Sequence, residues 1–181
     1  MVWRMSRFKT HYDSPIGGIT MVSDGEALLG LRFDGHTEDT DDGNAVWADG
    51  LPVFGLAFRW LDEYFAGREP EVRVPIRLEG TPFREEIWAL LRDVPYGETV
   101  SYGELAHRLE AKRADGRKVS ARAVGGAVHH NPVGVMVPCH RVIGSDGSLT
   151  GYAGGLDVKA RLLRLEGALE KPDCLAGASL L

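Results

Sequence analysis

A proline-containing stretch, residues 68–80, divides this chain into two halves that differ in their hydrophobic pattern. Before it, short apolar runs are separated by turn-forming residues, which is typical of strands. After it, apolar residues recur at helical spacing. A length of 181 residues leaves room for one large domain or two small ones. We therefore predict an α+β chain with an N-terminal domain at 1–80, a C-terminal domain at 81–169 and a tail at 170–181.

The first half predicts a small α/β unit and gathers no catalytic residue types. The polar, acidic stretch from His36 to Asp49 lacks periodicity, so we expect a loop there. The expected strands are Phe8–Asp13, Ile19–Ser23 and Ala27–Phe33, and the expected helix is Leu51–Ala66, which Gly67 ends.

The second half predicts several short helices. Thr81 and Pro82 carry start signals, and Ser101 with Glu104 forms a capping-box pattern. A short helix, a charged connection and another short helix suggest a helix-turn-helix. The expected helices are Thr81–Val94, Tyr102–Leu109, Ser120–His130 and Leu156–Gly167, with a charged bridge at Glu110–Lys118, a buried strand at Gly134–Val137 and a hairpin wing around Ser145-Asp146-Gly147.

The helix expected at Ser120–His130 has unusually small side chains. Arg122 is the one long side chain among Ala121, Ala123, Gly125, Gly126 and Ala127. Two adjacent glycines cost roughly 1 kcal/mol each relative to alanine inside a helix, so something must approach this backbone closely. Two explanations are open at this point: another helix packs there, or the helix enters a nucleic-acid groove.

Charge is distributed unevenly. The formal net charge is −5, but residues 108–141 contain seven Lys or Arg and two Asp or Glu. A local positive field attracts phosphate even when the net charge is negative. The alternative is a solvated basic loop, which charge alone favours.

Cys139 is the candidate nucleophile, because it precedes His140 and Arg141, and a neighbouring imidazole or cation favours the thiolate. The alternative is a buried, inert cysteine. Two cysteines, no signal-peptide pattern and no long apolar run predict a cytoplasmic protein without a membrane span or disulfide framework. We expect no metal site and no cofactor, because neither zinc-ligand spacing nor a nucleotide-phosphate loop is present.

Several motifs in order carry a resemblance to one family. They are Val100-Ser101-Tyr102, Ala121-Arg122-Ala123-Val124-Gly125-Gly126-Ala127, Asn131-Pro132, Val137-Pro138-Cys139-His140-Arg141-Val142, Gly151-Tyr152-Ala153-Gly154-Gly155-Leu156 and Leu165-Glu166-Gly167. Together they resemble the O6-alkylguanine-DNA alkyltransferases. The resemblance covers about residues 81–167, and Ser14-Pro15-Ile16-Gly17 is a weaker match to the N-terminal domain of bacterial members. It implies a ribonuclease-H-like domain followed by a winged helix-turn-helix-like domain.

The resemblance also implies a role for each matching residue. Cys139 would take the alkyl group once and keep it, His140 would accept the thiol proton through a water, and Glu166 would orient His140. Tyr102 would assist the leaving guanine. The remaining implied roles are DNA binding by Arg122 and the small residues Ala121, Ala123, Gly125, Gly126 and Ala127, a base pocket walled by Tyr152, Ala153 and Val142, and a structural hinge at Asn131.

The implied partner is duplex DNA containing O6-alkylguanine, with O4-alkylthymine as a second candidate lesion, bound by a monomer after base flipping. Two other functions are open: a sensor that flips damaged bases without chemistry, and a Cys-His hydrolase. Cys139 argues against the sensor. The hydrolase lacks a legible oxyanion-hole motif and gives the small-residue helix no purpose. The chain departs from the family pattern in the longer connection Glu110–Ser120, in His129-His130 and in Ala153, where some members have serine.

Overall fold

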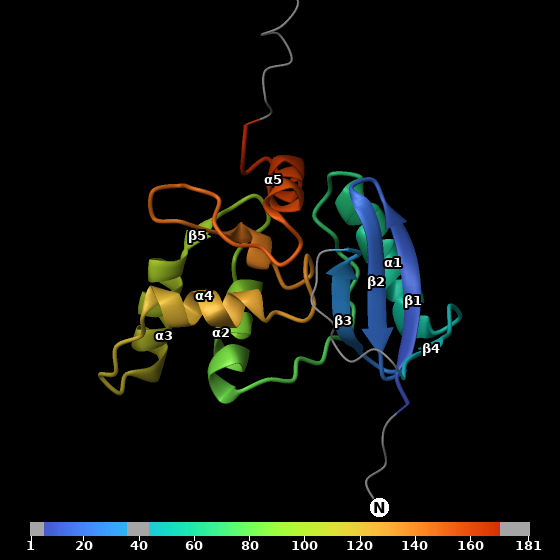
Figure 1. The fold of residues 1–181 in the computed structure, drawn as a ribbon, viewed down its shortest axis with the longest axis horizontal. Coiled ribbons are helices and arrows are strands. Elements are labelled where there is room, and N and C mark those ends of the chain that lie inside the picture. The colour runs from blue at the N-terminus through green and yellow to red at the C-terminus, as the bar shows by residue number, and fades with distance from the viewer. Residues whose placement is uncertain (1–5, 36–43, 171–181) are drawn as a thin grey trace, which may run out of the picture.

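The computed structural model describes residues 6–35 and 44–170, and it divides them between a sheet-containing half and a helical half (Figure 1). The N-terminal half holds a four-stranded sheet in the order β3-β2-β1-β4. Its strands are β1 (Phe8–Ser14), β2 (Gly17–Ser23), β3 (Leu28–Phe33) and β4 (Val46–Trp47). Neighbouring strands β1, β2 and β3 are antiparallel, whereas β4 lies parallel to β1. The α+β prediction is confirmed.

One helix, α1 (Pro52–Phe65), covers one face of this sheet (Figure 1). Its buried residues Phe54, Ala57 and Leu61 recur at helical spacing and face the strands. Gly67 follows the helix with φ +77°, as expected for a glycine that ends a helix. The three expected strands and this helix are confirmed. The loop prediction for His36–Asp49 is wrong at β4, because a strand of two residues is too short to show a periodic pattern in the sequence. Residues 36–43 of that stretch lie outside the described ranges.

The C-terminal half contains helices α2 (Pro82–Arg92), α3 (Tyr102–Arg113), α4 (Ala121–His129) and α5 (Leu156–Leu165). The expected caps are present: Thr81 accepts from the Arg84 amide, and Ser101 and Glu104 form a complete capping box. Helix α3 is longer than predicted, so the expected charged bridge begins later. Arg113 in its last turn pairs with Glu86 of α2, which extends the helix beyond Leu109.

The segment that leads to Cys139 differs from its prediction. Gly134–Val137 is buried at both valines but forms a turn, because Val135 adopts a left-handed φ of 65°. The predicted hairpin wing around Ser145-Asp146-Gly147 does not form two paired strands. The Gly144 amide does donate to Ser148 at 2.8 Å. However, β6 (Val142–Ile143) pairs in parallel with β5 (Val100–Ser101) instead.

The two halves are joined through the edge of the sheet. The Leu31 amide of β3 donates to Pro132 at 2.9 Å, and the Gly134 amide donates back to Leu31 at 3.0 Å. A second bridge pairs Leu28 with Ile76 of the connecting segment. These contacts cover an edge that would otherwise present unpaired backbone groups. The segment before Cys139 is therefore anchored on the N-terminal sheet.

Helix α5 lies above the junction of the two halves (Figure 1). Its residues Leu162 and Leu163 are fully buried, whereas Leu165 is only partly buried. Residues 171–181, which include Cys174 and nearly all of the predicted tail, lie outside the described ranges. No helix within 6–35 and 44–170 is long and apolar enough to cross a membrane.

Candidate active site

Cys139 lies at the start of a 3-10 turn, η1 (Cys139–Arg141), not at the end of a strand. On a strand, Cys139 and His140 would point to opposite faces. In a 3-10 turn the angle between successive side chains is smaller, about 120°, so the two side chains can take part in one site. The thiol is 6% exposed and His140 is fully buried. The turn therefore sets His140 behind the thiol, inside the protein.

Asn131 fixes the position of the thiol. Its side-chain amide nitrogen lies 3.1 Å from Sγ of Cys139 and donates to the Val137 carbonyl at 2.7 Å. Its amide oxygen accepts from the Val133 amide at 3.1 Å. One side chain thus ties the end of α4 to the turn before Cys139.

Burial raises the pKa of the Cys139 thiol, and the hydrogen bond from Asn131 and the charge of Lys159 only partly oppose it. The resting side chain is therefore a neutral thiol at neutral pH. A nucleophilic step at this cysteine requires a nearby proton acceptor.

His140 and Glu166 form a buried pair beside the cysteine. Nε2 of His140 lies 2.6 Å from Oε1 of Glu166. Burial lowers the pKa of His140 despite the opposing hydrogen bond and charge of Glu166. His140 is therefore neutral at neutral pH. Among the described residues, its Nδ1 is a buried atom without a hydrogen-bond partner.

Arg141 supplies the positive charge that keeps Glu166 ionised. Its Nε donates to Oε2 at 2.8 Å and its Nη2 to Oε1 at 3.1 Å. Burial alone would raise the pKa of Glu166, but hydrogen bonds and charge from His140 and Arg141 lower it to about 2. Because His140 is neutral at neutral pH, the positive charge that stabilises the Glu166 carboxylate at that pH comes from Arg141.

Lys159 of α5 is a site residue that the sequence analysis missed. Its fully buried ammonium donates to the carbonyls of Val142 at 2.5 Å, Thr150 at 2.7 Å and Gly151 at 3.3 Å. Burial lowers the pKa of Lys159 to about 8, against the opposing influence of Cys139. A lysine three and four residues before the buried Leu162 and Leu163 is a signal that could have identified it.

A cavity of about 400 Å³ opens onto Cys139 between α4 and the loop before α5. Its size is that of a small-ligand pocket. Tyr102 lines it and donates its hydroxyl to the Thr150 carbonyl at 3.2 Å. The cavity is lined by Tyr102, Ala121, Arg122, Gly125, Val128, His129, Cys139, Thr150, Gly151, Tyr152 and Ala153.

Seven of the fourteen predicted site residues line this cavity, and three more, Asn131, His140 and Glu166, form the hydrogen-bonded groups next to Cys139 described above. Ala121, Arg122, Ala123 and Gly126 are exposed on α4, and Gly125 is half-buried. Ala127 instead faces the core, where its carbonyl accepts from Trp88 Nε1 at 2.8 Å. Val142, expected in the pocket wall, is fully buried beside Lys159 and does not line the cavity. Ala127 and Val128 are buried because they lie three and four residues after the buried Val124, on the same face of the helix.

Comparison with known proteins gives matches over both halves. Residues 82–168 match the 6-O-methylguanine DNA methyltransferase DNA-binding domain, and residues 8–78 match the ribonuclease-like domain of the same proteins. The expected ribonuclease-like domain followed by a DNA-binding domain is thereby confirmed.

Individual relatives agree. The methylated-DNA–protein-cysteine methyltransferase of Haemophilus influenzae is 41% identical over 162 residues, covering 88% of this chain and 86% of that protein. A crystal structure of Mycobacterium tuberculosis O6-methylguanine methyltransferase is 41% identical with a TM-score of 0.79, covering 92% of this chain and 96% of that one. A structure of the M. tuberculosis protein in complex with DNA is 42% identical with a TM-score of 0.78, covering 89% and 93%. The chain belongs to the methylated-DNA–protein-cysteine methyltransferase family.

Proposed function

We propose that this protein repairs DNA by moving the alkyl group of O6-alkylguanine onto Cys139, which keeps it. In this step Sγ forms a bond to the alkyl carbon while the bond from that carbon to guanine O6 breaks. The thiol loses its proton and the departing guanine gains one, so no cofactor is consumed. The observation that carries the proposal is a cysteine that lines a cavity and is followed in the chain by the histidine of a buried histidine-carboxylate pair.

The proton path follows from the charge states of the site. A neutral thiol must lose its proton during attack, and neutral His140 accepts it at Nδ1 through a water. Ionised Glu166 then stabilises the imidazolium. Tyr102 exchanges its hydrogen bond to Thr150 for one to the base and assists protonation of the leaving guanine. Asn131 acts as the structural hinge that keeps Sγ aimed into the cavity.

Helix α4 is the proposed DNA-binding surface. The alkylated atom is unreachable inside a duplex, so the base must rotate out into the cavity. Arg122 fills the space that the base leaves, while Ala121, Ala123, Gly125 and Gly126 let the helix backbone approach the minor groove. Ala127 contributes by packing α4 on the core. Tyr152 and Ala153 wall the flipped base, and Val142 supports that wall from behind.

The remaining assignments complete the proposal. Residues 81–169 bind DNA and carry out the transfer, residues 1–80 support them, and 170–181 form a tail. The substrate is duplex DNA carrying O6-alkylguanine, with O4-alkylthymine as a second lesion to test. The protein acts as a monomer in the cytoplasm, where sparse thiols stay reduced.

The test is intact mass measurement after mixing the reduced protein with duplex DNA that contains O6-methylguanine, followed by peptide mapping. We expect one added methyl per protein molecule, located on Cys139, with no further turnover. Cys139→Ala is the control and should bind the methylated duplex without gaining mass. A methyl on another residue would contradict the assignment of Cys139. Several lesions repaired per molecule would favour a hydrolase, and binding without transfer by the native protein would favour a sensor.

A further inference from the structure

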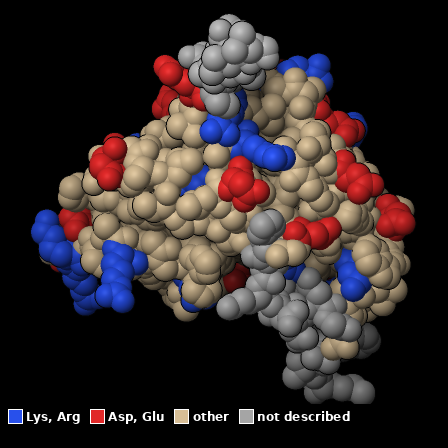
Figure 2. Space-filling view, turned by 45° about the horizontal axis from the view of Figure 1, so that its top comes forward, with Lys and Arg blue, Asp and Glu red and all other residues tan. Residues whose placement is uncertain are grey.

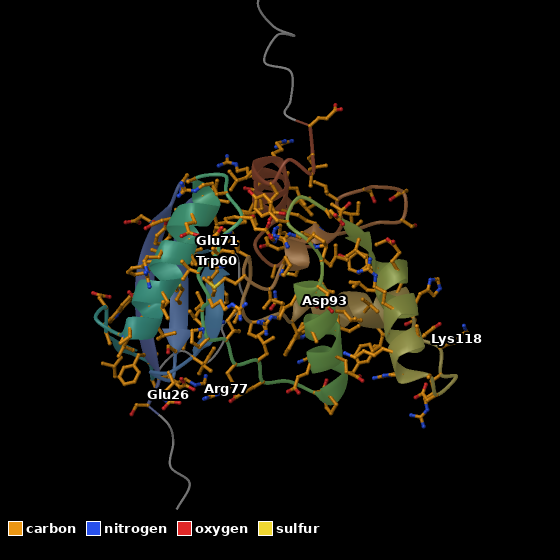
Figure 3. The ribbon with its side chains drawn as sticks, turned by 180° about the vertical axis from the view of Figure 1, so that it is seen from behind. Glu26, Trp60, Glu71, Arg77, Asp93 and Lys118 are labelled. Carbon is orange, nitrogen blue, oxygen red and sulfur yellow. The ribbon has the colours of Figure 1, made fainter. Side chains whose placement is uncertain are left out.

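Tyr64 reaches the histidine-carboxylate pair from the other half of the molecule. It belongs to α1, yet its hydroxyl donates to Oε1 of Glu166 at 2.7 Å. The side chain is fully buried. Figure 3 shows α1 from behind with Trp60 labelled. Tyr64 follows Trp60 by about one turn of the same helix. A hydroxyl from the N-terminal half thus touches the carboxylate that orients His140.

The direction of this hydrogen bond is fixed by charge. Glu166 is ionised, so its oxygens only accept, and Tyr64 must be the donor. The same Oε1 lies 2.6 Å from Nε2 of His140, while the Tyr64 oxygen lies 3.4 Å from that nitrogen. Nε2 therefore carries the hydrogen of neutral His140, and Nδ1 stays free to accept a proton.

The Tyr64 ring is held by aromatic neighbours, so its hydroxyl has little freedom to leave Glu166. Trp60 stacks on it with ring centroids 5.2 Å apart. Phe65 meets it edge-on at 5.3 Å and Tyr96 at 6.1 Å. His140 itself is 6.4 Å away in the same edge-on geometry. Side chains locked by packing are those that can position a reacting group accurately.

We infer that Tyr64 is a positioning residue for methyl transfer: by sharing Oε1 of Glu166 with His140, it limits how strongly the carboxylate holds the imidazole proton. This inference rests on the proposed function. It assigns to the N-terminal half a direct part in the proton relay, although no residue described in that half lines the cavity at Cys139.

Loss of the hydroxyl has a defined chemical consequence. Among the residues that the structure describes, Oε1 would keep His140 and Arg141 as its donors, so it would become a stronger acceptor for the hydrogen on Nε2. The pKa of His140 would rise, since a stronger acceptor favours the imidazolium. More His140 would then be protonated before the reaction and unable to take the thiol proton. Methyl transfer would slow at acid pH.

The experiment compares Tyr64→Phe with native protein by single-turnover methyl transfer from O6-methylguanine duplexes between pH 5 and pH 9. We expect the acid limb of the rate profile to move up by about 0.5 to 1 pH unit, slowing transfer roughly 3- to 10-fold at pH values below the native limb and leaving it unchanged on the alkaline plateau. The final extent should stay at one methyl per molecule. Duplex affinity should not change, because Tyr64 does not reach the DNA-facing cavity.

The matched control is Tyr12→Phe, which removes another tyrosine hydroxyl from a carboxylate on α1. Tyr12 donates to Asp62 at 2.7 Å, away from Glu166. Its profile should coincide with the native one. In a Glu166→Gln background, Tyr64→Phe should add no further shift, because its effect passes through that carboxylate. A shift that persists in this background contradicts the inference.

The outcomes separate the inference from the proposed function. If native protein transfers no methyl group, the proposed function fails. If native protein transfers and Tyr64→Phe has the native pH profile, only the positioning role fails. Should the phenylalanine variant not fold, 3-fluorotyrosine at position 64 keeps the shape and strengthens the donor. The acid limb should then move to lower pH, and an unmoved limb overturns the inference.

Discussion

Lys159 places an ammonium group inside the protein, where three backbone carbonyls replace its water shell. Two of these carbonyls, Thr150 and Gly151, belong to the loop that walls the cavity. A buried charge is tolerated only when its hydrogen bonds are satisfied. The lysine therefore sets the position of this loop relative to β6 and α5.

Lys159→Met should destabilise the protein by roughly 2 to 4 kcal/mol, because it leaves buried carbonyls without donors. Urea denaturation measures this free energy of unfolding. Lys118→Met is the matched control: the Lys118 side chain is 89% exposed, so its loss should change stability by less than about 0.5 kcal/mol. Equal effects of the two substitutions would show that the three carbonyls do not depend on Lys159.

Glu166 should make stability depend on acid. Its pKa is about 2 in the folded protein, below the ordinary value of 4.5, so the unfolded chain binds this proton more tightly. Its stabilising contribution is therefore complete above about pH 4.5 and is lost as the pH falls toward 2. This group alone should cost about 2 kcal/mol between pH 5 and pH 3.

Denaturation of Glu166→Gln over the same pH range measures this contribution. The variant should start less stable, because Arg141 loses its partner, and should then lose less stability with acid than the native protein. The exposed Glu98→Gln should keep the native acid dependence. Parallel curves for native protein and Glu166→Gln would mean that another carboxylate is responsible.

Single residues were predictable where a motif marks them. Cys139, His140 and Glu166 stand in recognisable motifs, and the structure brings them together. Tyr64 and Lys159 do not, since a tyrosine or lysine in an apolar stripe normally packs its stem and exposes its polar end. Their partners are carbonyl and carboxylate oxygens far away in sequence, which no local pattern specifies.

Helix α4 combines poor helix propensity with an exposed face. A Cβ on Gly126 would have no neighbouring atom within 4 Å, so the core does not require glycine there. Gly126→Ala should therefore raise the free energy of unfolding by about 0.5 to 1 kcal/mol. It should also weaken binding to duplex DNA, because the methyl group would hold the backbone away from the groove.

Gly55→Ala in α1 is the matched control for this helix. A Cβ there also meets nothing within 4 Å, but α1 lies away from the proposed DNA surface. The substitution should stabilise the protein similarly and leave duplex affinity unchanged. Fluorescence anisotropy measures the duplex affinity of both variants. If Gly126→Ala binds the duplex as tightly as the native protein, α4 does not contact the DNA.

Helices were predicted better than irregular segments. Thr81, Ser101 and Ser120 cap their helices as their sequence patterns indicate. The buried turn at Gly134–Val137 was mistaken for a strand, because β-branched residues satisfy both descriptions. The feature that distinguishes the turn from a strand is the left-handed backbone of Val135, a conformation that a β-branched side chain disfavours. Hydrogen bonds that join Pro132 and Gly134 to Leu31, which is distant in sequence, hold the segment in that conformation.

On the whole molecule, basic side chains gather at the end formed by α3 and the loop that follows it, on the left of Figure 2. Figure 3 places Lys118 at this outer end. The Arg117 and Lys118 side chains are 83% and 89% exposed, although both approach acidic neighbours. Their position beside α4 would bring them to the DNA backbone outside the flipped base.

Replacing Arg117 and Lys118 together with alanine should flatten the salt dependence of duplex binding. Each lost phosphate contact lowers the slope of log affinity against log salt by about 0.9. Arg59→Ala, an exposed arginine on α1, should leave the slope unchanged. If the double variant keeps the native slope of log affinity against log salt, the connection between α3 and α4 makes no phosphate contacts and is only a solvated loop.

The arrangement of the two halves was the least predictable level. Both domains were expected from the sequence, but nothing local specifies that β3 pairs with residues on either side of Val133, or that α1 faces Glu166. Such contacts depend on surfaces that exist only after each half has folded. The sequence therefore described the parts of the molecule better than their junction.

The β3 edge also has a consequence for biosynthesis. The N-terminal sheet leaves the ribosome first, while the segment that covers the Leu31 edge is still to be made. During that interval an open strand is available to pair with other chains. We expect truncated products that end before Pro132 to aggregate, and slow translation of the second half to lengthen the hazardous interval.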